Sequence, residues 1–124
     1  MASNIPTEST TYDNLFAGSQ QSIVTQTGTI VTGSGKLARG CVLGRITASG
    51  KLGPVNKALA TGQEKVYAVL AQDVDATSAD VTNALIYMTG EFRTQSLTFG
   101  ATDTAADHKY NAELANIYFR DAVV

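Results

Sequence analysis

Residues 66–71 read VYAVLA and residues 84–93 read ALIYMTGEFR, and these two stretches decide the fold class. The first is an apolar run with the length of a buried strand, and the second combines an apolar start with an extended pattern. Neighbouring side chains in a strand point to opposite faces, so Val69 and Leu70 should face opposite ways, and Ile86 should lie mid-strand. We therefore expect at least two of these three side chains to be buried.

The chain on either side of these stretches favours further strands. Residues 23–32 are β-branched and rich in threonine, which predicts a strand with a possible bulge at Gly28. Residues 41–46 and 97–99 predict two shorter strands. The fold class expected from this pattern is mainly β, a small α+β domain.

Polar and glycine-rich segments separate the predicted strands. Residues 33–36, 48–51 and 73–80 carry turn signals, since their glycine, serine and aspartate residues favour turn conformations. Residues 50–65 contain Gly-Pro and Thr-Gly pairs and predict a long surface connection.

One short C-terminal helix is expected near residues 105–116. Thr104 can cap its first turn together with Asp107, three residues further on. Four apolar side chains then fall on one helical face, which we expect to face the core: Ala106, Tyr110, Leu114 and Ile117. This arrangement places His108 on the exposed face.

Length and composition fit one domain preceded by an arm. The chain has 124 residues, 44% of them hydrophobic and 16% charged, and no apolar run approaches the ~18 residues of a membrane span. Residues 1–14 are polar and lack apolar periodicity, so we expect a flexible N-terminal arm. Residues 15–124 are expected to form a single β-rich domain.

Charge is unevenly distributed along the chain. The first 62 residues carry five basic and two acidic groups, whereas the remainder carries four basic and nine acidic groups. No acidic residue lies between Lys36 and Lys57, which fits either a solvated loop face or a face for an acidic partner. We expect no nucleic-acid contact, because the net charge is −2 and no aromatic residue lies between Phe16 and Tyr67.

Candidate catalytic and metal sites are incomplete in this sequence. Residues 33–37 suggest a phosphate-binding loop, but they lack its first glycine and its magnesium-binding hydroxyl. Asp73 and Asp75 have the opening spacing of a calcium loop, without its central glycine and final glutamate. His108 is the single histidine, and the single cysteine, Cys41, precedes an apolar stretch and is expected to be a buried, inert thiol. We expect no enzyme, no metal and no cofactor.

Four segments resemble one known family in order and spacing. They are residues 33–44 (GSGKLARGCVLG), 67–76 (YAVLAQDVDA), 87–92 (YMTGEF) and 116–119 (NIYF). Together they are similar to head decoration proteins of tailed bacteriophages, of the lambda protein D type. Asn116 stands where the resemblance leads us to expect a glycine.

The resemblance implies a β-clip-like fold that binds as homotrimers at threefold and quasi-threefold sites of the expanded head. Its partner would be the major capsid protein, and its role would be to stabilise the shell against packaged DNA. The protein would be made in the cytoplasm of the host bacterium, would reside on the capsid exterior of the virion, and would have no membrane partner.

Two sets of residues are candidates for these contacts. The N-terminal arm can adopt an extended strand and pair with a sheet edge on the shell; its candidate residues are Ile5, Pro6, Thr7, Thr10, Thr11 and Tyr12. A glycine inside an apolar strand and an apolar chain end suggest trimer contacts; these residues are Gly90, Val123 and Val124.

Two other functions remain open. A tail, fibre or other binding module could use exposed aromatic residues, with Tyr12 and Tyr118 as candidates. A β-clip nucleotide hydrolase would need a glycine-rich phosphate-binding tail, and residues 120–124 contain no glycine.

Overall fold

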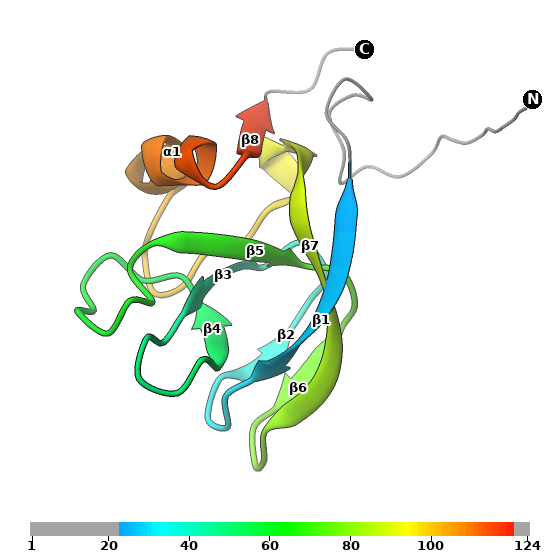
Figure 1. The fold of residues 1–124 in the computed structure, drawn as a ribbon. Helices are drawn as coiled ribbons and strands as arrows, with labels where there is room; N and C mark the ends of the chain where they lie inside the picture. Colours follow the sequence, from blue (N-terminus) through cyan, green and yellow to red (C-terminus); the bar gives the residue numbers. More distant parts are fainter. Residues whose placement is uncertain (1–22, 121–124) are drawn as a thin grey trace, which may run out of the picture.

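The structure, a computed structural model, describes residues 23–120 and has a mainly β fold (Figure 1). Its elements are β1 (Val24–Ile30), β2 (Gly35–Leu37), β3 (Val42–Arg45), β4 (Leu52–Pro54), β5 (Val66–Leu70), β6 (Val74–Ala76), β7 (Val81–Arg93), the short 3-10 helix η2 (Thr94–Ser96), α1 (Ala105–Leu114) and β8 (Ile117–Arg120). The predicted fold class, mainly β with one short C-terminal helix, is confirmed.

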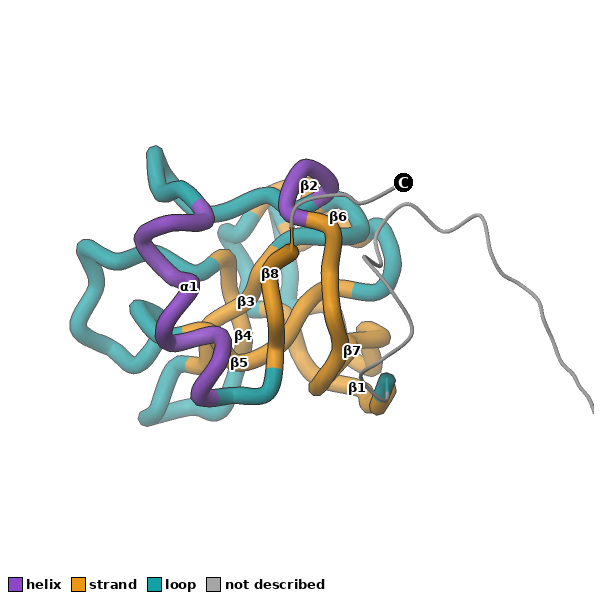
Figure 2. Tube along the Cα trace, turned by 90° about the horizontal axis from the view of Figure 1, so that it is seen from above, coloured by secondary structure: helices purple, strands orange, loops and turns teal. Residues whose placement is uncertain are grey.

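Five strands close into a barrel-like sheet. Their order is β1-β4-β3-β5-β7, and an additional antiparallel pairing between β1 and β7 joins the two ends. The long strand β7 then continues past the barrel, where β8 pairs with residues 90–93 in parallel. In Figure 2, β8 lies between β7 and α1, so the helix covers this extension of the sheet.

Two apolar clusters form the core, on opposite faces of the sheet. One draws on the five barrel strands and includes Leu70 and Ile86. The other includes Val69 and packs against α1 and β8. Val69, Leu70 and Ile86 are all buried, which confirms the prediction from the two apolar stretches and the opposite orientation of Val69 and Leu70.

Three predicted connections contain short strands instead. The predicted turns at 33–36 and 73–80 overlap β2 and β6, which pair with each other in a separate two-stranded sheet. The predicted surface connection at 50–65 contains β4 and the buried side chains of Leu52 and Val55. Strands of three residues are too short to show a hydrophobic period, so turn residues dominated the pattern.

Smaller differences concern strand ends and one predicted strand. The stretch predicted at 97–99 forms a single bridge, Thr98 to Cys41, rather than a strand. The pairing register of β1 with β7 shifts after Gly28, which agrees with the predicted irregularity there. The main chain of Asn116 has φ 63°, a left-handed conformation that favours glycine or asparagine, so asparagine can occupy the position where a glycine was expected.

The helix prediction is correct in position and wrong in orientation. The Asp107 carboxylate accepts a hydrogen bond from the Thr104 N–H at 2.9 Å, as the predicted cap requires. However, Tyr110 and Leu114 are 72% and 67% exposed, and Ala106 also faces solvent. The buried side chains of α1 are His108, which meets the Asp103 carboxylate, and Ala112, whose small side chain lets the helix lie close to the sheet.

Candidate functional site

The segments predicted to make contacts attach to strands that flank β7. Val24 opens β1, which pairs with the first part of β7, and Arg120 ends β8, which pairs with its last part. The six candidate arm residues, together with Val123 and Val124, lie outside the described residues. The arm precedes β1 and the chain end follows β8, and both of these strands pair with β7.

Gly90 lies in β7 where its partner changes from β1 to β8. It is buried, has φ 151°, and its N–H donates to the Asn116 C=O at 3.3 Å. A Cβ at this position would lie 3.1 Å from the Phe92 ring and 3.6 Å from Ile23. The subunit itself thus gives a reason for glycine here, and a trimer contact at Gly90 stays a prediction.

His108 was expected on the exposed face of the helix and is instead buried, with 1% of its surface exposed. Its Nε2 lies 2.6 Å from the Asp103 carboxylate, and its ring stacks on Phe99 at 5.8 Å. An ionised carboxylate can only accept hydrogen bonds, so Nε2 donates. The pattern of apolar residues alone could not reveal this pair, because the cost of burying the ring is offset by a carboxylate outside the helix.

Asp103 and Asp107 tie the helix to the connection between β4 and β5. The Asp103 oxygen that meets His108 also accepts the Lys57 N–H at 2.7 Å, and the Lys57 ammonium lies 3.1 Å from Asp107. Burial raises the pKa of Asp103, but the hydrogen bonds from His108 and Lys57 outweigh it and hold the pKa below its ordinary value. This network holds α1 against the connection between β4 and β5 and therefore has a structural role.

Two of the five basic side chains between Lys36 and Lys57 pair with acidic residues of the second half. Lys51 lies 2.7 Å from Asp80, and Lys57 bridges to Asp107. The Arg39 main-chain N–H donates to Asp73 at 2.8 Å, whereas the Arg39 guanidinium donates to the Tyr87 hydroxyl at 2.9 Å. The side chains of Lys51, Lys57 and Arg39 thus make contacts within the subunit.

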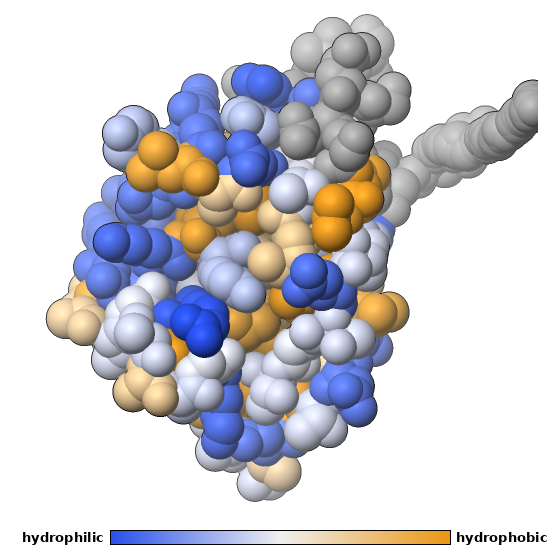
Figure 3. Space-filling view, in the orientation of Figure 1, coloured by the Kyte–Doolittle hydropathy of each residue, from blue (hydrophilic) through white to orange (hydrophobic). Residues whose placement is uncertain are grey.

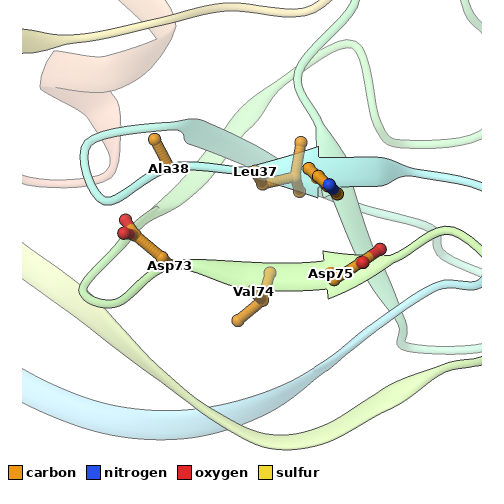
Figure 4. Close-up of a pocket in the computed structure, with 6 residues that line it drawn as sticks. Leu37, Ala38, Asp73, Val74 and Asp75 are labelled. Carbon is orange, nitrogen blue, oxygen red and sulfur yellow. The ribbon is translucent and has the colours of Figure 1, made fainter.

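Asp73 and Asp75 line a shallow depression of about 470 Å³ between β2 and β6. Figure 4 shows the two carboxylates pointing in different directions. Asp73 accepts the Arg39 N–H, whereas Asp75 accepts the N–H and hydroxyl of Thr77 at 3.0 and 2.6 Å. The carboxylates that opened an incomplete calcium loop thus serve their own turns.

Cys41 has the environment of a buried structural thiol. It is 3% exposed, and burial raises its pKa to about 11. The thiolate that acts as a nucleophile is scarce at neutral pH when the pKa is this high. The expectation of a buried cysteine is confirmed.

Two further features concern metal ligands and the length of the helices. No group of three or more His, Cys, Asp or Glu side chains gathers within residues 23–120. The helices of this same part are too short and too polar to cross a membrane.

Comparison with known proteins identifies the family. A search of curated proteins found no match. The family model described as bacteriophage lambda head decoration protein D matches residues 5–117, which is most of the chain and includes all elements from β1 to α1. The same range contains three of the four segments that suggested this resemblance in the sequence and the first two residues of the fourth, 116–119. The chain therefore belongs to the bacteriophage lambda head decoration protein D family.

Proposed function

We propose that this protein binds the exterior of an expanded phage head as homotrimers, at threefold and quasi-threefold sites, and stabilises the shell against packaged DNA. Its partners are the major capsid protein and two further copies of itself. The observation that carries the proposal is the family match across residues 5–117. The protein is synthesised in the host cytoplasm, becomes part of the virion exterior, and acts without catalysis.

The composition of the chain supports a role based on contacts. Cys41 is buried, His108 is engaged by Asp103, and the carboxylates of Asp73 and Asp75 are held by their own turns. These side chains are thus committed to the fold rather than to a substrate. A protein that strengthens a shell needs extended contacts with its neighbours instead.

The arm is proposed to attach the folded body to the shell. Residues Ile5 to Tyr12 include β-favouring threonines, and an extended segment can add a strand to an exposed sheet edge through main-chain hydrogen bonds. Ordering such a segment costs on the order of 1 kcal/mol per residue, so the arm should bind when the folded body is already docked. Gly90, Val123 and Val124 remain proposed trimer contacts.

Deletion of residues 2–14 tests the attachment. The deleted protein should keep the melting temperature of the full chain, because the buried apolar core is formed by side chains between Ile30 and Phe119. Its affinity for expanded heads that lack decoration protein, measured by co-sedimentation, should fall severalfold or more. An arm-deleted protein that decorates heads with full affinity would contradict the proposed role of the arm.

A further inference from the structure

The outer edge of β1 is open over most of its length. β1 pairs with β7 from Val24 onward, but β4 meets β1 at a single position, Ile30 to Leu52. Within residues 23–120, no strand pairs with the other side of the Val24–Gly28 segment. Figure 1 shows β1 as the outermost strand of this flank.

Two observations fix which main-chain groups face this open edge. Leu85 lies opposite Thr27, and its C=O accepts from the Ala71 N–H at 2.9 Å while its N–H donates to the Gln72 side chain at 2.6 Å. The polar main-chain groups of Leu85 therefore point away from β1. In an antiparallel ladder such a pair is not hydrogen-bonded, so the N–H and C=O of Thr27 point away from β7.

The end of β1 that meets β4 gives the same orientation for the main-chain groups of Thr27. The Val31 N–H donates to the Leu52 C=O at 2.8 Å, on the side of β1 opposite β7. Main-chain groups alternate sides along a strand, so Thr25 and Thr27 face the same side as Val31. Within residues 23–120, neither threonine N–H has an acceptor on that side.

The edge strand itself carries no charge and combines exposed threonine and glutamine with apolar side chains. Residues 24–30 read VTQTGTI, without a charge or a proline. Ile23, Val24 and the neighbouring Leu85 are 45%, 43% and 43% exposed, and Figure 3 shows apolar surface on this flank. Exposed edge strands of soluble proteins usually carry lysine, proline or a bulge that prevents pairing with other chains. The open segment carries neither lysine nor proline, and the register with β7 is regular from Thr25 to Gly28.

We propose that the Val24–Thr27 segment of β1 accepts an extended strand of the shell protein, held by the main-chain groups of Thr25 and Thr27. The 22 residues that precede Ile23 lead directly into β1, and the arm within them is the segment proposed to pair with the shell. A partner strand that pairs with the arm can continue along β1 in the same direction. This inference rests on the proposed function and extends its contact from the arm into the folded body.

Two substitutions at Thr27 test this edge. Thr27→Pro removes the outward N–H while leaving the hydrogen bonds between β1 and β7, and proline is tolerated at such edge positions. Thr27→Lys places a charge on the edge without changing the main chain. Both variants should keep the melting temperature within a few degrees. The affinity of Thr27→Pro for expanded heads should fall about fivefold, the loss expected for one main-chain hydrogen bond. The affinity of Thr27→Lys should also fall, because pairing would place its charge against the partner strand.

Thr82→Lys is the matched control, since Thr82 is exposed on β7, where this strand meets the Gly28–Ile30 end of β1 rather than the open Val24–Thr27 segment. It should bind heads with wild-type affinity. Wild-type affinity of both Thr27 variants, in an assay where arm deletion weakens binding, would overturn this inference and leave the proposed function standing. A full-length protein that does not bind heads would overturn both.

Cross-linking identifies the occupant of the edge. The natural Cys41 is buried, so a photoreactive reagent should label the engineered thiol of Thr27→Cys selectively. Irradiation on decorated heads should give an adduct with the major capsid protein, and Thr82→Cys should give less. An adduct with a second copy of this chain would overturn the assignment to the shell.

Discussion

Asp103 connects three parts of the chain through one carboxylate, and this gives its charge a structural role. It accepts hydrogen bonds from His108 on α1 and from the Lys57 main chain, and both contacts favour the ionised form. A carboxyl whose pKa is lowered by folding stabilises the folded state at pH values above its unfolded pKa, about 3.9. That stabilisation is lost as the pH falls through the lowered pKa of the folded state.

The variant Asp103→Asn tests this linkage. At neutral pH it should melt well below the wild-type protein, because the amide cannot replace the charge-assisted bond to His108. The difference in melting temperature should shrink as the pH is lowered from 5 towards 2. Asp73→Asn, at an exposed carboxylate, is the control with a smaller effect. A pH-independent gap between Asp103→Asn and wild type would contradict the account of this network.

Glycine at position 90 has two candidate reasons, which are packing within the subunit and a contact in the trimer. Gly90→Ala should destabilise the free protein by about 1 to 3 kcal/mol, since the new methyl group would crowd Phe92 and the main chain is at φ 151°. Gly33→Ala, at φ 86° with open space around it, should show the conformational cost without the packing cost. Denaturant titration of both variants measures the difference. If Gly90→Ala were as stable as the wild type, packing within the subunit would not explain this glycine, and the proposed trimer contact would be the remaining reason for it.

Among the elements, α1 departs furthest from expectation. Its small and polar residues face the core, and its largest apolar side chains face solvent. Ala112→Leu should therefore cost about 1 to 3 kcal/mol through overpacking against the sheet. Leu114→Ala should change the free energy of unfolding by less than about 0.5 kcal/mol, because Leu114 makes few buried contacts. The reverse order of effects in urea unfolding would contradict the observed orientation of the helix.

The sequence predicts the long strands better than the short ones, because only a long strand shows a recognisable apolar pattern. β5 and most of β7 carry apolar runs long enough to identify a buried strand. β2, β4 and β6 have three residues each and form because longer strands and turns bring them together. The buried pair of His108 and Asp103 was not predictable either, since it depends on how the loop before α1 folds back.

The candidate contact surface could be predicted in part. The sequence alone indicated an extended arm and a threonine-rich strand beginning at residue 23. It could not show that β1 pairs with β7 along one side and leaves Thr25 and Thr27 facing an open edge, because that depends on register. Alternation fixes such orientation only after one hydrogen bond is known, here from Val31 to Leu52.

At the scale of the whole molecule, basic side chains of the first half of the chain form ion pairs with acidic side chains of the second half. Ion pairs of Lys51 with Asp80 and of Lys57 with Asp107 join the two halves of the chain, so two of the five basic side chains of the stretch are paired within the subunit. What remains for partners on the β1 flank is an uncharged strand edge and exposed apolar side chains. This distribution fits a subunit that is attached by shape and main-chain pairing more than by charge.

The central claim is that the protein decorates expanded heads in threes. The most direct measurement is a saturation titration of purified full-length protein onto expanded, undecorated heads, with bound copies per head counted after sedimentation. We predict a plateau at a multiple of three that matches the number of threefold and quasi-threefold sites on the head. No binding, or a plateau that tracks single capsid subunits rather than these sites, would contradict the claim.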